Sequence, residues 1–549
     1  MKINRFQRFA ALILSIPISS CMMNSPAQAA PAASGVWSDW ITALQAQGYT
    51  VTQGDAILHN CDALVAVFKN CNGNNPAGHY VDSEPPIDDE YVDPCYNAAH
   101  DCSGKTANLF TGTATVPTGS TTSVNQFFRV NDTDAIVLVI NLPPKAAYFG
   151  TQTYDYSRAR SQYSQGCKFF SSDKAPNPCR NQTRASIGSA VNNVVIKNQT
   201  GLDLGSGGTV AVVTTSNQAL FDALGNAFSG VGGDKNLLLA EPLGATITAG
   251  THTAGVITGV DSNGDELNTL IRYTLPEDET AADDWQNSIA DNIQVFRIRK
   301  ADGPVTVYNN VSLATKQFAN DDTVYKPALN ELANSLSKWL TSVNSSFALR
   351  RLVTTSATYS ASGVPMSGYI GPICLETGTN CLRDTQDTDS YRFGNPGKLD
   401  RTIVVVGVNG AYTGNSTYTS LGIARADLFE GISTLAQTNP TATGFSSGTL
   451  GGSASDLVAT LVAAGQIPQP SQQLTAALPN LYVGIITRAC ASPSDPSAPF
   501  FCAKNYTVNV DETEVPANVA IQTVQRNYIL PGQPTGANPY YVATPIVLK

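Results

Sequence analysis

Charged residues and histidines are scarce in this sequence. Asp, Glu, Lys and Arg make up 14% of the 549 residues, and only four residues are His. The 33 basic residues are outnumbered by 43 acidic ones, which gives a net charge of -10. Proteins that bind nucleic acid concentrate Lys and Arg on one face, because contacts to phosphate dominate their affinity. Nucleic acid is therefore not expected as a partner.

The cysteines lack the C-x-x-C spacing that is typical of zinc and redox sites. When Cys21 is set aside, the other ten of the 11 cysteines form pairs of near neighbours along the chain. This orderly, even-numbered set predicts local disulfides and an oxidising compartment, and it predicts neither a metal nor a cofactor. The expected pairs are Cys61 with Cys71, Cys95 with Cys102, Cys167 with Cys179, Cys374 with Cys381, and Cys490 with Cys502.

The first part of the sequence has no apolar run long enough to span a bilayer, which takes about 20 residues. Its apolar run covers only residues 10–18, and three basic residues precede it. This pattern is typical of a signal peptide, which we place at residues 1–29. Export from the cytoplasm agrees with the predicted disulfides.

Two cleavage sites are compatible with this signal peptide. Cleavage before Cys21, after the lipobox-like residues 18–20, would leave Cys21 at the new N-terminus with a lipid attached. Cleavage after Ala29 would instead release a secreted protein. The lipobox is favoured because it directly follows the apolar run. We therefore expect a lipoprotein of the periplasm or outer membrane, with Cys21 as its membrane anchor and residues 30–36 as a tether.

Hydrophobic residues make up 42% of the sequence and are spread along it, which predicts a buried core. Runs of β-branched residues outnumber amphipathic helical stretches, and the two do not alternate regularly. We expect an α+β fold of β-rich mixed sheets with a few packed helices and disulfide-pinned loops. No repeat of fixed period is visible. The expected strands include 135–140, 148–156, 209–214, 237–239, 293–298, 403–408, 482–486 and 540–548, and the expected helices include 220–228, 283–291, 329–343 and 455–464.

Two larger-scale expectations follow from the same patterns. The β run at 135–140 is broken by Pro143 and Pro144 before the aromatic stretch at 148–156, which predicts a β-hairpin. A stretch rich in Ser, Thr and Ala marks a domain boundary. We place an N-terminal α+β domain at 37–345 and a C-terminal β-rich domain at 346–549.

Known catalytic motifs are incomplete. Residues 444–448 match G-x-S-x-G, but an α/β-hydrolase needs a strand before this motif and a histidine after it. All four histidines lie earlier in the chain. Ser171 with Lys174 matches S-x-x-K without its companion motifs, and the glycine-rich stretches do not have the spacing of a phosphate-binding loop. The sequence therefore identifies no reaction.

The best candidates for a binding site are polar and aromatic residues near the expected ends of strands, where sites often collect. Ordinary hairpin and turn chemistry is the competing explanation for each of them. The candidates are Tyr148, Tyr154, Arg158, Asn409 and Tyr412.

Three short patterns resemble those of a family of uncharacterised exported proteins. The resemblance covers about half of the chain and implies no activity, cofactor or catalytic residue. The patterns are Pro143-Pro144 with Tyr148-Phe149 and Tyr154, Ser186-Ile187-Gly188 with Asn192-Asn193, and Gly407-Val408-Asn409 with Thr413-Gly414.

Two hypotheses for function remain. The first is a non-enzymatic envelope protein that binds an extracellular ligand or partner, which agrees with the lipobox, the acidic charge balance and the scarce histidines. The second is a secreted hydrolase acting on an ester, peptide or glycan, which agrees with the size and the pinned loops. We prefer the first.

Overall fold

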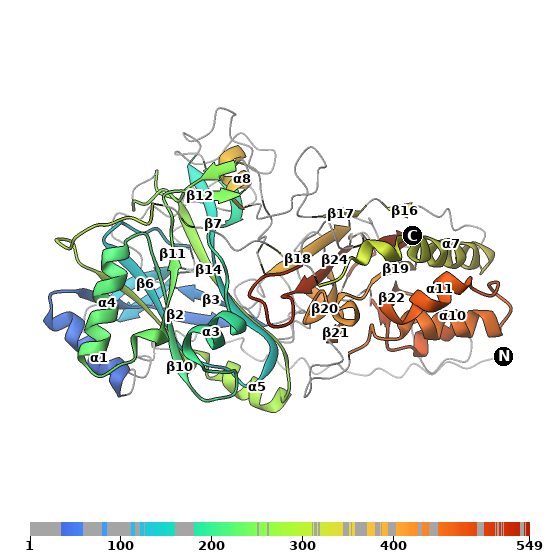
Figure 1. Cartoon of the computed structure of the whole chain (residues 1–549), viewed down its shortest axis with the longest axis horizontal. Coiled ribbons are helices and arrows are strands. Elements are labelled where there is room, and N and C mark those ends of the chain that lie inside the picture. The colour runs from blue at the N-terminus through green and yellow to red at the C-terminus, as the bar shows by residue number, and fades with distance from the viewer. Residues whose placement is uncertain are drawn as a thin grey trace, which may run out of the picture.

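The computed structural model places the chain in two lobes that lie side by side along the long axis of the molecule (Figure 1). The residues that it describes are 35–58, 79–84, 111–115, 121–125, 127–159, 180–249, 252–260, 263–309, 311, 316, 319–343, 351–352, 354–356, 371–378, 381, 385, 387–393, 402–425, 431–438, 448–490, 499–510, 512, 515–517, 519, 521–537, 543 and 545–548.

The first lobe contains two sheets. Sheet 1 has the strand order β1-β15-β6-β10-β11, in which every pair is antiparallel except β10 with β11. Sheet 2 is antiparallel and has the order β2-β3-β14-β7-β8, with β9 also paired to β7. Their bounds are β1 Thr50–Gln53, β2 Asp55–Leu58, β3 His79–Glu84, β6 Asp134–Asn141, β7 Ala146–Ala159, β8 Arg180–Ser186, β9 Val191–Asn192, β10 Thr209–Thr215, β11 Leu238–Pro242, β14 Glu266–Pro276 and β15 Ile293–Arg299.

The central strand β6 is apolar on both faces, and each face packs against a different layer. Ile136 and Leu138 pack towards Phe149 and Ile271 of sheet 2. Val137 and its neighbours pack against helices α1 and α4. The lobe therefore has three layers: helices α1 and α4 cover sheet 1, and sheet 1 packs on sheet 2. The helices of the lobe are α1 Val36–Ala46, α3 Asn193–Thr200, α4 Gln218–Gly230, η2 Lys235–Leu237, α5 Glu279–Asn287 and α6 Ile289–Asn292. Two small hairpins are formed by β4 Thr111–Thr115 with β5 Thr121–Asn125 and by β12 Ile247–Ala249 with β13 His252–Ala254.

The second lobe also contains two sheets. Sheet 3 has the order β16-β25-β19-β22-β23, and sheet 4 has the order β17-β18-β24-β20-β21. The helices that pack on sheet 3 include α7, α10 and α11. The bounds of its elements are β16 Arg351–Leu352, β17 Thr354–Ser356, β18 Thr388–Phe393, β19 Ile403–Val408, β20 Tyr418–Arg425, β21 Gly431–Thr438, β22 Leu481–Thr487, β23 Thr507–Asn509, β24 Ile521–Tyr528, β25 Ile546–Leu548, η3 Asp322–Tyr325, α7 Lys326–Val343, α9 Gly410–Thr413, α10 Ser453–Ala463, α11 Gln472–Ala477, η4 Leu478–Asn480 and η5 Phe500–Ala503. Helix α8 Gly371–Thr377 lies between β17 and β18 in the sequence but packs on the first lobe.

The two lobes have the same topology. Sheets 1 and 3 each begin with the first strand of their lobe, continue with its last strand, and end with a single parallel pair, β10 with β11 and β22 with β23. Sheets 2 and 4 correspond strand for strand in the same chain order, β7 with β20 and β14 with β24 among them. The chain is therefore an internal structural repeat, which no fixed period in the sequence revealed.

One helix and one segment fall on unexpected sides of the predicted boundary at 345/346. Helix α7 packs through Leu329, Leu336 and Leu340 into the core of the second lobe. The amphipathic stripe of α7 was recognised from the sequence, but its packing partner was not. Conversely, Cys374 and Leu375 of α8 belong to the core of the first lobe, so the chain returns to that lobe after β17.

The expected α+β class is confirmed, and the strand at 403–408 has the predicted bounds. The predicted β-hairpin is wrong, because β6 lies in sheet 1 and β7 lies in sheet 2. Pro143 and Pro144 lie where the chain passes from one sheet to the other, and their lack of N–H groups disfavours continued pairing.

Two of the five predicted disulfides are confirmed, Cys374–Cys381 and Cys490–Cys502. The other three pairs, the signal peptide, Cys21 and the G-x-S residues at 444–446 lie outside the described residues. No helix in the described part of the chain combines the length and the apolar character needed to cross a membrane.

Candidate functional site

The five predicted site residues lie on two elements. Tyr148, Tyr154 and Arg158 lie on the fully buried strand β7, and Asn409 and Tyr412 lie at the short helix α9 of the second lobe. The structure therefore divides the predicted site into separate places, each with its own chemistry.

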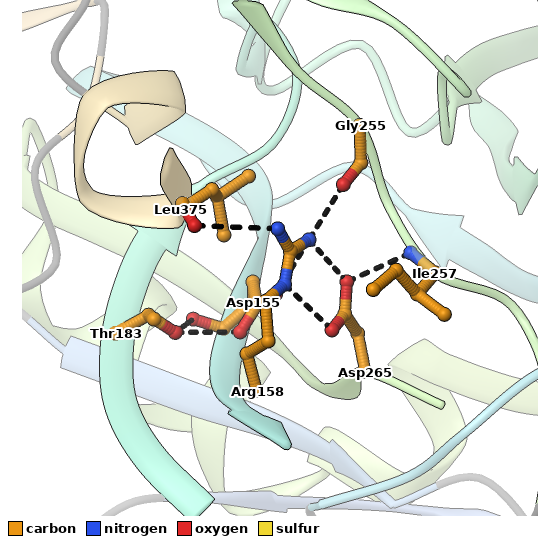
Figure 2. Close-up of polar contacts among 7 residues, drawn as sticks. All are labelled: Asp155, Arg158, Thr183, Gly255, Ile257, Asp265 and Leu375. Carbon is orange, nitrogen blue, oxygen red and sulfur yellow. Dashed lines mark hydrogen bonds and ion pairs between the residues drawn. The ribbon is translucent and has the colours of Figure 1, made fainter. Parts of the chain in front are cut away.

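Arg158 is held by protein groups from both halves of the sequence (Figure 2). Its Nε and Nη2 donate to the two carboxylate oxygens of Asp265 at 2.9 and 2.5 Å. Nη2 also donates to the Gly255 carbonyl at 2.5 Å, and Nη1 donates to the Leu375 carbonyl of α8 at 3.4 Å. A bidentate Arg–carboxylate pair of this kind fixes orientation as well as contributing energy. Arg158 thus fastens α8 to the first lobe.

Asp155 is a second carboxyl group beside Arg158, with 3.4 Å between its Oδ2 and the Nη2 of Arg158. Thr183 donates to its Oδ1 at 2.5 Å, and Asp265 lies close enough to interact with it. Burial, followed by the negative charge of Asp265, holds the pKa of Asp155 well above its ordinary value, against the opposing effect of Arg158. A buried carboxyl group with a raised pKa beside other charged groups is typical of acid–base sites, although structural ion pairs produce the same pattern.

Tyr154 is completely buried and is covered by Arg272 of the paired strand β14. The Arg272 guanidinium lies 5.5 Å from the centre of the Tyr154 ring and also donates a hydrogen bond to its hydroxyl. Both side chains lie on the face of sheet 2 that points away from sheet 1, because Phe149 and Ile271 occupy the opposite face.

Tyr148 lies on the same face of β7 and reaches the second lobe. Its hydroxyl donates a 2.5 Å hydrogen bond to Oδ2 of Asp387, which directly precedes β18. Asn192 Nδ2 donates to the same oxygen at 3.3 Å and to the Pro534 carbonyl at 2.8 Å. Burial and the nearby Asp387 raise the pKa of Tyr148 well above its ordinary value. At neutral pH, Tyr148 is therefore a neutral hydrogen-bond donor.

Aromatic rings continue this contact into the second lobe. Tyr528 on β24 lies 4.9 Å from Tyr148, measured between ring centres, and stacks on Tyr418 of β20 at 4.4 Å with 10° between the ring planes. Ala147 and Ile529 complete a small apolar cluster with the three rings. We call this group, with Asp387 and Asn192, the interlobe seam. It joins β7 to β20 and β24, the strands that correspond to β7 and β14 in the repeat.

Sequence reasoning identified Tyr148 but missed the other members of the interlobe seam. They come from positions 147 to 529, and no local pattern connects them. The duplicated topology relates β7 to β20, but it becomes visible only in the structure.

Each lobe also buries a polar network between its two sheets. In the first lobe, Glu241 accepts hydrogen bonds from the Thr153 hydroxyl at 2.5 Å and the Thr214 hydroxyl at 2.6 Å. In the second lobe, the Tyr482 hydroxyl on β22 of sheet 3 donates to Gln525 on β24 of sheet 4 at 2.5 Å. Burial raises the pKa of Glu241 above its ordinary value, while its threonine hydrogen bonds oppose the rise.

Asn409 and Tyr412 begin and end one turn of chain. Asn409 is completely buried and follows β19, and its carbonyl accepts a hydrogen bond from the Tyr412 amide at 2.9 Å. The Tyr412 side chain is 36% exposed. Among the described residues, no three His, Cys, Asp or Glu side chains are grouped as metal ligands.

No model of a known protein family matches this chain, and no curated protein matches its sequence. The chain is similar to a crystal structure of an uncharacterized protein from Burkholderia cenocepacia, with 9% sequence identity and a TM-score of 0.28. The similarity covers 81% of this chain and 77% of that chain. A TM-score this low carries no argument about function.

Proposed function

We propose that this is an exported, envelope-anchored protein that binds an extracellular ligand between its two lobes, at the interlobe seam. The contact of Tyr148 with Asp387 and Tyr528 carries the proposal, because it brings aromatic rings and a carboxylate together at a boundary between lobes. Ligand sites are found preferentially at such boundaries. Tyrosine suits them because it combines a large apolar face with a polar hydroxyl.

The composition of the interlobe seam also supports opening of the lobes. Its apolar part is a small cluster, whereas the cores inside each lobe are extensive. Interfaces between domains that are small and partly polar allow relative motion. A ligand would enter as the lobes part, and it would replace the hydrogen bond between Tyr148 and Asp387 with its own polar groups.

Ligand binding can be tested by thermal unfolding with defined probes, namely disaccharides, dipeptides and short-chain fatty acids. We expect one of these classes to raise the Tm of the wild-type protein and of Tyr412→Leu, which changes an exposed ring. The same class should leave the Tm of Tyr528→Leu unchanged, because that change removes the central ring of the interlobe seam. A probe that stabilises Tyr528→Leu as much as wild type would place binding elsewhere.

Export and anchoring can be tested by intact mass analysis of the protein from a bacterial envelope fraction. We expect a lipid on Cys21 and, on reduction, a gain of two hydrogens for every disulfide. Recovery of the unmodified, fully reduced chain from cytosol would contradict this part of the proposal. The two disulfides of the described structure agree with an oxidising compartment.

The alternative function is that of a secreted hydrolase, and the paired carboxyl groups of Asp155 and Asp265 favour it. Glycoside cleavage uses a pair of carboxyl groups, one of which acts as an acid with a raised pKa. Both side chains are fully buried and are held by Arg158, which favours a structural role. If the hydrolase is correct, the wild-type protein cleaves nitrophenyl esters, nitrophenyl glycosides or casein, and Asp155→Asn abolishes the cleavage.

A further inference from the structure

The carboxylate of Asp387 is bound by two neutral donors of the opposite lobe. The Tyr148 hydroxyl donates to its Oδ2 at 2.5 Å, and Nδ2 of Asn192 donates to the same oxygen at 3.3 Å. All three side chains are completely buried. No Lys or Arg among the described residues forms an ion pair with Asp387. The first lobe therefore binds a carboxylate through uncharged groups, and in this structure the second lobe supplies that carboxylate.

The two donors are positioned by elements of the first lobe. Asn192 caps α3, where its Oδ1 accepts from two N–H groups of the first turn at 3.2 Å each, so its Nδ2 is turned towards Asp387. Asn192 is also the register partner of Gly150, which follows Tyr148 by two positions on β7. A Cβ at Gly150 would lie 2.6 Å from the Tyr148 hydroxyl, so glycine leaves room for the two donors to meet. The positions of both donors are therefore set by β7, β9 and α3.

The surroundings of the two donors favour an anion with a flat apolar body. Arg272 lies near enough for its positive charge to oppose the rise in the pKa of Tyr148 that burial, and then the nearby Asp387, cause. A positive charge beside the donors attracts an anion. The Tyr528 ring lies 4.9 Å from the Tyr148 ring, measured between their centres. Aromatic rings gain energy from stacked and edge-to-face contacts with other rings, so a ligand with a ring of its own is favoured here.

We propose that Tyr148 and Asn192 form a carboxylate receptor, which Asp387 occupies while the lobes are closed and an aromatic carboxylate occupies when they part. This inference rests on the proposed ligand site at the interlobe seam and adds the chemical class of the ligand. Donors that bind one carboxylate bind another of the same geometry, and the negative charge strengthens both hydrogen bonds. Asp387 is then an internal competitor. It lowers the apparent affinity for the ligand, because only the open fraction of the protein can bind.

The test is titration calorimetry of the full mature protein with benzoate, and with benzamide as an uncharged probe of the same shape. We expect benzoate to bind more tightly than benzamide. Asp387→Ala should bind benzoate at least about tenfold more tightly than wild type, because a competing hydrogen bond to a charged group is worth at least that factor. Tyr148→Phe/Asp387→Ala should lose this gain, because the receptor then lacks the hydroxyl donor.

Asp322→Ala is the matched control, because it also removes a buried carboxylate from the second lobe. Asp322 is 1% exposed and accepts a hydrogen bond from Thr413, away from the interlobe seam. This variant should bind benzoate with the affinity of wild type. A gain in affinity equal to that of Asp387→Ala would mean that loosening of the second lobe, and not removal of the competitor, is the cause, and it would overturn the proposal.

A second variant keeps the test decisive if Asp387→Ala folds poorly. Asp387→Asn keeps the shape of the side chain but removes its charge, so it competes more weakly and should also bind benzoate more tightly than wild type. The proposal is overturned if benzoate binds none of these proteins, or if the Asp387 variants bind it no more tightly than wild type. Binding of a neutral disaccharide at the interlobe seam, without binding of benzoate, would overturn the carboxylate receptor and leave the proposed ligand site standing.

Discussion

Tyr148 in the first lobe donates a 2.5 Å hydrogen bond to Asp387, which lies 239 positions later in the sequence and directly precedes a strand of the second lobe. Both side chains are completely buried. The bond is therefore made away from water, where a hydrogen bond to a charged acceptor is strongest.

Tyr148→Phe should lower the free energy of unfolding by about 1.5–3 kcal/mol, because it removes a hydrogen bond to a charged group while the ring remains. Urea unfolding followed by tyrosine fluorescence measures the change. Tyr412→Phe is the control, since its ring is partly exposed, and it should fall within about 0.5 kcal/mol of wild type. Equal stabilities of the two variants would mean that Asp387 is satisfied without Tyr148.

Gly371→Ala should disrupt the docking of α8 on the first lobe. A Cβ at this position would lie 1.9 Å from the Ser186 carbonyl oxygen, a backbone atom of β8 that cannot move without distorting sheet 2. We expect a loss of more than about 2 kcal/mol in unfolding free energy, as for other overpacked contacts.

The matched control for this glycine is Gly230→Ala at the end of α4. A Cβ there meets nothing within 4 Å, so the variant should be as stable as wild type or slightly more stable. If Gly371→Ala unfolds at the same urea concentration as Gly230→Ala, α8 does not pack against β8 as described.

Loss of the Cys374–Cys381 disulfide should also weaken the docking of α8 on the first lobe. Its sequence separation is 7, and the entropy of a closed loop of this size corresponds to about 2.5 kcal/mol. In Cys374→Ser/Cys381→Ser we expect faster amide hydrogen exchange in α8 and β8. Cys490→Ser/Cys502→Ser removes a disulfide in the second lobe and should leave exchange in α8 unchanged.

The stability of the protein should also depend on pH through Asp155. Because the pKa of Asp155 is raised in the folded state, mainly by burial, folding favours the protonated acid. This contribution is fully present below the ordinary carboxyl pKa, near 4, and is lost as the pH rises towards the folded-state value. Asp155→Asn cannot ionise, so its stability relative to wild type should increase as the pH is raised above about 4, the ordinary carboxyl pKa. Parallel stability curves for the two proteins would contradict the raised pKa.

Local patterns predicted the buried strands β6, β10, β15, β19 and β22, but not β14, β20 or β24 of the antiparallel sheets. The β-branched run at 403–408 and the stripe of Leu329, Leu336 and Leu340 marked a strand and a helix, because burial imposes its period on the sequence. The strands on either side of Pro143 and Pro144 were predicted to form a hairpin, because local signals cannot tell pairing within one sheet from passage between two. The partners of Tyr148 were not predictable either, since Asp387 and Tyr528 reach it only through the tertiary fold.

The return of α8 to the first lobe means that the two halves of the sequence are not separable modules. A fragment that stops before residue 371 would lack Cys374 and Leu375, which complete the core of the first lobe. It would also lack the Leu375 carbonyl, to which Arg158 donates a hydrogen bond. If the chain is divided before α8, the first fragment therefore exposes the apolar surface that α8 covers, and the second fragment carries α8 without the surface on which it packs.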